Sequence, residues 1–345
     1  MLIGRAPVRI SFAGGGTDLP SYYLRHGGMV VSAAIDKYFY VFLTVNKRAN
    51  IEIMSSDYQT FHRQLAEEAM LWDGDLSLPR AVLNHFNIRE GLSMVLASQV
   101  PPGTGLGSSG TAAVAMIKAI TSLLGRGGLS KHDIAELASF IEIDKLGMPV
   151  GKQDQFAAAF GGINAIWFSP DGVVVEPLRV RSETVEQLER RLLLFYTGAA
   201  RDSARVLGEQ NRSTLEADAD VLSALNALKT MAGEVRRLLE SGDLDSFGEL
   251  LHESWERKKR LASGVTNARI DNCYQKARDL GALGGKITGA GGGGFLLLYC
   301  QSGTAAKVTE GLEGLGLKRM DFAFDFDGAR ILVNNALPFA VAGRA

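Results

Sequence analysis

The stretch VPPGTGLGSSGTAA (residues 100–113) places a glycine-rich loop between two apolar segments. Residues 94–97 precede it and predict a short strand. Residues 111–124 follow it and are apolar nearly all round, which predicts a buried helix that begins at Ser108 or Ser109. Glycines allow the N–H groups of a loop to converge, and the unpaired N–H groups and positive dipole end of the helix add to them. These features predict an anion site, most often one for phosphate.

Two other interpretations of this loop have to be weighed. One is a tight turn that packs the helix closely on a sheet. Residues 105–110 also satisfy the dinucleotide motif G-x-G-x-x-G, but that motif needs a second strand ending in an acidic residue about 20 positions on. Residues 125–128 and a capped helix occupy that region, which disfavours an oxidoreductase. Neither Gly-Lys pair, at 151–152 or 285–286, is followed by the Ser or Thr of a P-loop.

Length and composition exclude several classes of protein. The 345 residues suggest two domains, at about 100–200 residues each. The 37 basic and 38 acidic side chains leave no basic excess for nucleic acid. No apolar run approaches the ~18 residues of a membrane span, and the N-terminus lacks a signal-peptide core. With only Cys273 and Cys300, we expect a reducing, cytoplasmic location and neither nucleic-acid nor membrane partners.

The remaining pattern predicts an α+β protein in two halves. Apolar Val8, Ile10 and Phe12 alternate with Arg9 and Ser11, which predicts a strand that runs into the glycines at 14–16. Ser130-x-x-Asp133 resembles a capping box that opens a helix to about Leu146. Further strands are predicted at 29–45, 51–54, 192–196 and 295–299, a hairpin turn near 170–172, and long helices over 203–280.

Three stretches together resemble the signature motifs of the GHMP kinases, the superfamily of galactokinase, homoserine kinase, mevalonate kinase and phosphomevalonate kinase. They are APVRISFAGGGTDLP (6–20), VPPGTGLGSSGTAA (100–113) and KITGAGGGGFLLL (286–298). Within the superfamily, GKQDQFAAAFGG (151–162) and FYTGAARDS (195–203) look like the sugar 1-kinases that act on D-glycero-D-manno-heptose 7-phosphate.

The resemblance implies a two-domain α+β fold, with an N-terminal ribosomal-protein-like βαβ domain (1–185) and a C-terminal ferredoxin-like domain (186–345). It implies ATP and Mg²⁺ as cofactors and transfer to the anomeric hydroxyl of the heptose 7-phosphate. The 1,7-bisphosphate formed would serve nucleotide-activated heptose for surface polysaccharide. The alternatives are another sugar 1-kinase, for example one like fucokinase, and an inactive sensor of sugar or nucleotide. A homo-oligomer is possible.

The resemblance also implies roles for individual residues. Asp154 matches the base that accepts the hydroxyl proton, and Arg9 matches a cation beside it. Ser109 and Glu142 match the ligands of Mg²⁺. The residues implied for ATP are Pro102, Gly103, Gly105, Leu106, Gly107, Ser108 and Ser109. Those implied for the substrate are Gly15, Gly16, Thr17, Asp18, Arg201, Gly291 and Gly292.

Simpler interpretations exist for three of these residues. Arg9 could be a solvated side chain on the polar side of its strand. Asp154 could be a helix N-cap, which aspartate also favours. Glu142 could lie at the rim of a helix face, although its position near the apolar stripe makes an unpaired carboxylate costly.

The sequence departs from galactokinases at Gly15-Gly16, where those enzymes carry Glu-His. The loss of a carboxylate and an imidazole disfavours galactose and suits a bulkier or anionic substrate. A second phosphate on the sugar needs a cation, and the candidates are Arg201, which we prefer, Lys258 and Lys259.

Overall fold

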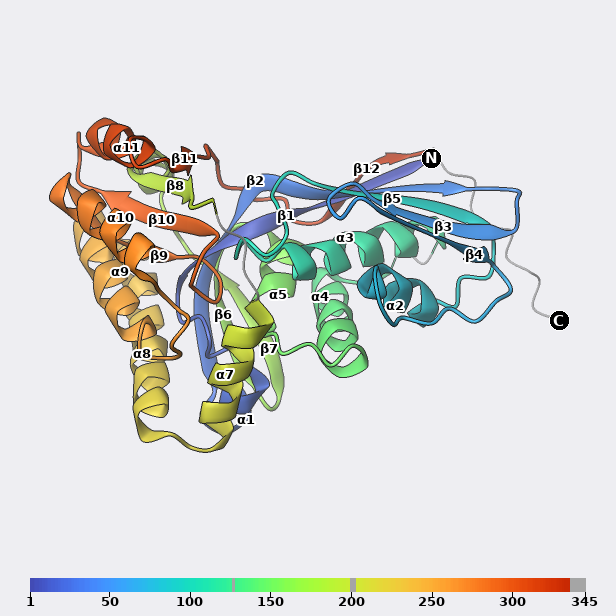
Figure 1. Cartoon of the computed structure of the whole chain (residues 1–345), viewed down its shortest axis with the longest axis horizontal. Coiled ribbons are helices and arrows are strands. Elements are labelled where there is room, and N and C mark those ends of the chain that lie inside the picture. The colour runs from blue at the N-terminus through green and yellow to red at the C-terminus, as the bar shows by residue number, and fades with distance from the viewer. Residues whose placement is uncertain (126–127, 199–202, 336–345) are drawn as a thin grey trace.

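The computed structural model describes residues 1–125, 128–198 and 203–335, and it contains two β-sheets with helices packed on them (Figure 1). The predicted α+β class is confirmed. Arg201, the preferred cation for a substrate phosphate, lies outside the described residues. No helix in the described part of the chain is both long and apolar enough to cross a membrane.

The first sheet has eight strands in the order β12-β1-β2-β5-β3-β4, and β6 and β7 branch from β2. Its strands are β1 (Leu2–Ala13), β2 (Gly28–Val45), β3 (Asn50–Ser55), β4 (Thr60–Leu65), β5 (Leu92–Ser98), β6 (Ile163–Ser169), β7 (Gly172–Pro177) and β12 (Arg330–Asn334). The helices of this part are α1 (Pro20–His26), α2 (Ser77–His85), α3 (Ser108–Leu123), α4 (Lys131–Phe140) and α5 (Gln153–Phe160), with a π-helical segment η1 (Ile141–Lys145).

The second sheet is antiparallel and comprises β8 (Leu192–Tyr196), β9 (Ala282–Ile287), β10 (Phe295–Cys300) and β11 (Lys318–Arg319). Its order β11-β8-β10-β9 places the fourth, first, third and second strands side by side, which is the ferredoxin-like arrangement. Its helices are α6 (Ser182–Arg191), α7 (Ser203–Leu215), α8 (Ala219–Ser241), α9 (Leu244–Lys258), α10 (Ala268–Asp279) and α11 (Ala305–Glu313).

Strand β2 forms one continuous 18-residue element that pairs with β1, β5 and β6. It therefore holds the two ends of the first sheet together, and it sets Arg9 of β1 opposite Ala34. Strand β12 pairs with β1 and brings Asn334 beside Leu2. The chain thus returns to the first sheet after it has formed the second, so no single cut separates the two sheets. The domain boundary at 185/186 stays a prediction.

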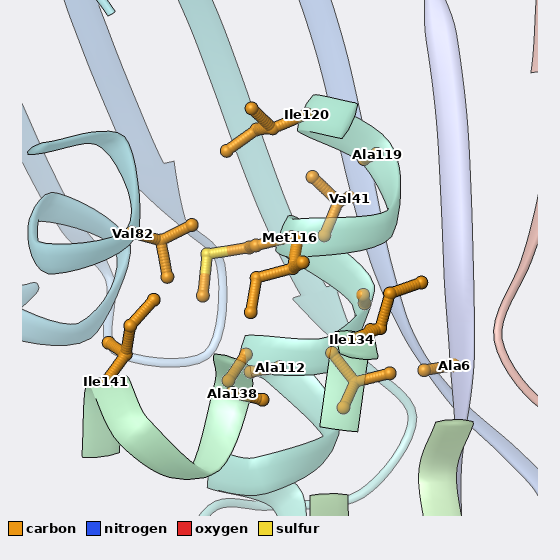
Figure 2. Packing of buried hydrophobic residues seen from close by; sticks show 14 of the residues in the cluster. Ala6, Val41, Val82, Ala112, Met116, Ala119, Ile120, Ile134, Ala138 and Ile141 are labelled. Atoms are coloured by element: carbon orange, nitrogen blue, oxygen red, sulfur yellow. The ribbon is translucent and has the colours of Figure 1, made fainter. Parts of the chain in front are cut away.

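Helix α3 is the centre of the first core (Figure 2). It begins at Ser108, as predicted, and it packs between the sheet and helices α2 and α4. Met116 is fully buried, and small residues such as Ala112 and Ala119 let the neighbouring elements approach closely. The surrounding side chains shown in Figure 2 include Ala6, Val41, Val82, Ile134, Ala138 and Ile141. This packing fixes the N-terminus of α3, and with it the glycine-rich loop.

The capping box that opens α4 is confirmed. Ser130 accepts a hydrogen bond from the backbone N of Asp133 at 3.1 Å, and Asp133 accepts one from the backbone N of Ser130 at 3.0 Å. The helical path then continues through η1 to Lys145, close to the predicted end at Leu146. The wider turn of η1 matters for the site because it carries Glu142.

Candidate active site

The glycine-rich loops of the second motif (100–113) and the third motif (286–298), here the second and third loops, touch through their backbones. A β-carbon on Gly289 would lie 2.5 Å from the Cα of Gly105, and one on Gly105 would lie 2.4 Å from the carbonyl oxygen of Thr288. The backbone N of Phe295 donates to the carbonyl of Thr104 at 3.2 Å. Contacts this close exclude side chains, so the glycines allow two segments about 185 residues apart to form one floor.

Arg9 connects this floor to Asp154. Its side chain is 3% exposed, so the interpretation as a solvated arginine is wrong. The Nη1 atom donates to the carbonyl oxygen of Gly105 at 2.7 Å. The Nε atom donates to Oδ1 of Asp154 at 2.8 Å, and the Nη2 atom forms an ion pair with the same oxygen at 2.5 Å. A buried guanidinium is tolerated here because it is both paired and hydrogen-bonded.

Asp154 is the second residue of α5, and Lys152 precedes that helix, so the N-cap interpretation is also wrong. Its side chain is 26% exposed and lines a cavity. A β-carbon on Gly107 would lie 3.0 Å from the Asp154 Cγ, and Gly107 has a φ of +80°. Glycine at this position therefore lets the carboxyl group approach the loop that precedes α3.

Ser109 and Glu142 meet at the start of α3. The Ser109 Oγ donates to Oε1 of Glu142 at 2.5 Å, and Nε2 of Gln155 donates to Oε2 at 2.6 Å. Glu142 is 1% exposed, so it does not lie at a helix rim as the simpler interpretation had it. Burial raises the Glu142 pKa to about 7; the charge of Asp154 acts in the same direction, and the two hydrogen bonds oppose it.

These two residues fit the requirements of Mg²⁺. A hydroxyl and a carboxylate converge beside the glycine-rich loop that precedes α3, the predicted phosphate loop, and the carboxylate sits where its charge is costly without a cation. The described residues contain no group of three or more His, Cys, Asp or Glu side chains suited to a metal. Mg²⁺ commonly takes one or two carboxylates and completes its shell with substrate phosphates and water. Ser109 and Glu142 would hold it in that way.

Two cavities meet at the loop. The smaller, about 230 Å³, is lined by polar and charged side chains that include Arg9, Asp18, Gln153, Asp154, Gln210 and Lys258. The larger, about 590 Å³, has walls that include Phe39, Leu76, Leu96 and Met116. Gly103, Ser108 and Ser109 line both. The buried Ser108 Oγ has no hydrogen-bond partner among the described residues, so it is available to a phosphate oxygen.

Most of the residues predicted to bind the nucleotide line one of the two cavities, but Leu106 does not. Pro102 lines the larger cavity, and Gly105 and Gly107 line the smaller one. The Leu106 side chain is fully buried in the core, and its carbonyl accepts from the backbone N of Arg9 at 3.0 Å. The loop is therefore anchored to β1 by Leu106 while its glycines face the cavities.

The predicted sugar residues are not all turned toward the smaller cavity. Gly16 and Asp18 line it. Thr17 is fully buried; its Oγ1 donates to the carbonyl of Gly14 at 2.8 Å and accepts from the backbone N of Met29 at 3.1 Å. Thr17 thus shapes the loop, and Gly15 is absent from the cavity lining that the described residues form.

The third loop contributes different residues from those predicted. Gly289 and Ala290 line the smaller cavity. The backbone N of Gly292 donates to the carbonyl of Val265, and a β-carbon on Gly291 would lie 2.5 Å from that same oxygen. Gly291 and Gly292 are thus turned toward Val265, and the loop meets the cavity at the residues just before them.

Of the two candidate lysines, the structure brings Lys258 to the cavity. Lys258 is 6% exposed, and its Nζ donates to the carbonyl of Gly289. The Lys259 Nζ forms an ion pair with Glu256 at 2.6 Å outside the cavity. The two neighbours in sequence therefore differ sharply in environment.

The sequence analysis did not predict two polar residues that line the smaller cavity, Gln153 and Gln210, or the buried Lys286 behind them, whose charge interacts with Arg9 and Asp18. Gln153 lies beside Asp154 in a stretch that we quoted, so its position was a usable signal. Gln210 of α7 lines the cavity, but no motif marks it. Lys286 is 2% exposed on β9 and donates to the carbonyl of Phe12 at 3.3 Å. Burial lowers the Lys286 pKa to about 7; Arg9 adds to the effect and Asp18 opposes it.

Comparison with known proteins decides the family. The family model described as "GHMP kinases N terminal domain" matches residues 77–162, and the one described as "GHMP kinases C terminal" matches residues 235–315. A D-glycero-alpha-D-manno-heptose 7-phosphate kinase of Campylobacter jejuni is 31% identical over 332 residues, 94% of this chain and 97% of that protein. The chain belongs to the GHMP kinase family. It is a sugar kinase, an enzyme that transfers phosphate to an alcohol group.

Two further relatives agree with this assignment. The crystal structure of a D-glycero-D-manno-heptose 1-phosphate kinase from Bacteroides thetaiotaomicron has a TM-score of 0.81 and 29% identity, and the match covers 97% of this chain and 100% of that one. The bifunctional fucokinase/GDP-fucose pyrophosphorylase of Arabidopsis thaliana is 27% identical over 87% of this chain and 30% of its own length. The predicted two-domain GHMP kinase fold is confirmed, and ATP is the phosphate donor that GHMP kinases use.

The buried carboxylate of Glu142 predicts a pH-dependent stability in metal-free protein. Its folded pKa of about 7 exceeds the ordinary 4.5, so the stability from protonated Glu142 is complete below pH 4.5 and is lost as the pH rises through 7. Glu142→Gln should therefore gain stability over the wild type at about pH 8, on the order of 3 kcal/mol, and little at about pH 4. Thermal unfolding in chelator measures this. Mg²⁺ should then stabilise only the wild type at the higher pH, and a variant equally destabilised at both pH values would contradict the buried charge.

The contact between Gly107 and Asp154 predicts a position-specific loss of activity. Gly107→Ala places a methyl group 3.0 Å from the Asp154 Cγ, which must displace the carboxyl group. We expect kcat to fall by roughly 10²-fold, the usual effect of about 1 Å of misplacement. Gly125→Ala is the matched control, because Gly125 also has a positive φ, +65°, but no atom of the described residues lies within 4 Å of its added carbon. Equal losses in both variants would show that backbone strain alone explains the effect.

Proposed function

We propose that this kinase transfers the γ-phosphoryl group of ATP to the C1 hydroxyl of D-glycero-D-manno-heptose 7-phosphate, which yields the 1,7-bisphosphate. The observation that carries the proposal is the Arg9–Asp154 pair, which sits at the junction of the phosphate loop and a polar cavity. The names of the Campylobacter and Bacteroides relatives both specify a heptose phosphate, and this supports the choice of sugar.

Asp154 supplies the base in this proposal. Arg9 holds its Oδ1 through one hydrogen bond and one ion-pair contact, so Oδ2 is left to accept the proton of the attacking hydroxyl. The sugar oxygen then bonds to the γ-phosphorus, and the bond from that phosphorus to the β-phosphate bridging oxygen breaks to release ADP. Because Arg9 also holds the Gly105 carbonyl, the base and the phosphate loop keep one geometry.

The loop and the start of α3 supply the positioning on which phosphoryl transfer depends. The first N–H groups of α3 lack partners within the helix, and the Ser108 hydroxyl is unpaired among the described residues. They would bind phosphate oxygens, with the nucleoside in the larger cavity. Mg²⁺, when bound by Ser109 and Glu142, supplies the charge neutralisation that the phosphates require.

Lys258 would recognise the 7-phosphate. Lys258 ends α9 and lines the smaller cavity, which would hold the sugar. An ammonium group there gives an anionic substrate a nearby opposite charge. A neutral sugar, as in a fucokinase-like 1-kinase, would have no use for this charge. The substrate test below therefore separates the two candidates.

Replacing Asp154 by Asn should lower kcat roughly 10²–10⁴-fold, because an amide cannot accept the proton while the shape of the side chain is kept. The KM for the sugar should change much less. An ATP-consumption assay with Mg²⁺ and a small sugar panel measures both. Asp144→Asn, at an exposed carboxylate of η1, is the control and should retain full activity. Near-normal kcat in the Asp154→Asn variant would overturn the base assignment, and a wild type without turnover would indicate a sensor.

The paired lysines test the substrate charge. Lys258→Met should weaken heptose 7-phosphate binding roughly 10- to 150-fold, the effect of losing one charge-assisted hydrogen bond of about 1.5–3 kcal/mol. Lys259→Met, one residue further along the chain, should leave the Kd unchanged. Calorimetry on both variants measures sugar-phosphate and ATP affinities, and ATP affinity should hardly move. Equal turnover of the unphosphorylated heptose by the wild type would instead favour a neutral-sugar kinase.

A further inference from the structure

Gln153 lines the smaller cavity, which would hold the sugar, and it carries an unsatisfied buried acceptor. It is the first residue of α5, it precedes the base Asp154, and it is 9% exposed. Its Nε2 donates to Oδ2 of Asp18 at 3.0 Å. Its Oε1 is buried and has no hydrogen-bond partner in the part of the chain that the structure describes.

Asp18 fixes which way this amide points. The Asp18 carboxylate accepts from the backbone N of Gly16 at 3.0 Å and from the backbone N of Gln153 at 3.3 Å, in addition to the Gln153 side chain. The backbone N–H groups of Gly16 and Gln153 favour the ionised form of Asp18. An ionised carboxylate offers acceptors only, so a rotated amide would set its own oxygen against Oδ2 and lose a hydrogen bond. The NH₂ group therefore stays on Asp18, and Oε1 stays turned away from it.

A buried acceptor without a donor costs about 1–3 kcal/mol, and folded proteins seldom leave such atoms unpaired. The atom belongs to a cavity-lining side chain next to the proposed base, so a molecule bound in the cavity can supply the missing donor. A sugar presents hydroxyl groups on consecutive carbons. The hydroxyl beside the reacting one therefore comes within reach of Gln153 when the reacting one meets Asp154.

We propose that Gln153 is a specificity-determining residue whose Oε1 accepts a hydrogen bond from the sugar hydroxyl adjacent to the phosphorylated one, at C2. Asp18 is then a positioning residue, which acts on the sugar by orienting the Gln153 amide. The inference rests on the proposed function and deepens it. It assigns the recognition of one hydroxyl to an amide oxygen, where the sequence pointed to the Asp18 carboxylate.

Binding of matched sugars tests the assignment. The Kd values of heptose 7-phosphate and of its 2-deoxy and 2-fluoro analogues are measured by calorimetry, so that electronic effects on C1 chemistry do not enter. We expect the wild type to bind both analogues roughly 5- to 150-fold more weakly, because neither can donate a hydrogen bond from C2. The fluoro analogue is the informative one, since it can still accept a hydrogen bond.

Gln153→Met removes the acceptor and keeps the length of the side chain. This variant should bind the natural sugar as weakly as the wild type binds the 2-deoxy sugar, and it should show no further loss with the analogues. Asp18→Ala should lose the same discrimination, and the double variant should be no worse than either single one. Gln210→Met, which removes a different amide from the same cavity, should keep the discrimination at C2. Unchanged ATP affinity reports that each variant is folded.

Two outcomes decide the matter separately. If Gln153→Met discriminates against the 2-deoxy sugar as strongly as the wild type, Gln153 does not read that hydroxyl, its oxygen binds internal water instead, and the inference is overturned. If the wild type prefers another sugar in the panel, the proposed substrate is wrong, and the same cycle with that sugar and its 2-deoxy form still decides the role of Gln153.

Discussion

The hydrogen-bonded ion pair between Arg9 and Asp154 is the constraint on which the site depends. Arg9 is on the first strand, Asp154 is on a helix 145 residues later, and the same guanidinium also holds the carbonyl of Gly105. One buried side chain thus joins β1, the glycine-rich loop before α3 and helix α5. A guanidinium without such partners would be costly in this setting, so the three segments are stabilised as a unit.

The glycines serve this convergence by removing side chains where backbones must meet. Gly105 and Gly289 bring the second and third loops into contact, and the absence of a side chain at Gly107 lets the Asp154 carboxyl group approach the second loop. Two further ionisable side chains, Asp18 and Lys286, are buried near these contacts. Burial raises the pKa of Asp18 and lowers the pKa of Lys286, so it favours the neutral form of each. The same close packing that shapes the cavity therefore makes each of its polar groups dependent on a specific partner.

Local patterns predicted the elements that carry the site. Helix α3 begins at Ser108 because a glycine-rich loop meets a long apolar run, and the capping box at Ser130 opens α4 where Ser-x-x-Asp marks it. The motifs also pointed to Asp154, Ser109 and Glu142, and the structure brings the first two to one cavity, with Glu142 bonded to Ser109 beside it. Simpler interpretations of Arg9 and Glu142 failed because their burial is set by elements distant in sequence. The N-cap interpretation of Asp154 failed because α5 begins one residue before it.

The sequence by itself determined the family, the α+β class and the residue types available for phosphoryl transfer, because these depend on short contiguous motifs. Only the tertiary structure decided which side chains face the smaller cavity. It turned Thr17 and Gly291 into the packing, brought Lys258 but not Lys259 to the cavity, and placed Gln153 and Gln210 on its wall. These outcomes arise because the fold brings α7, α9 and the third loop to the same cavity as β1 and α5. Contacts between segments far apart in the chain leave no periodicity or spacing for a single sequence to display.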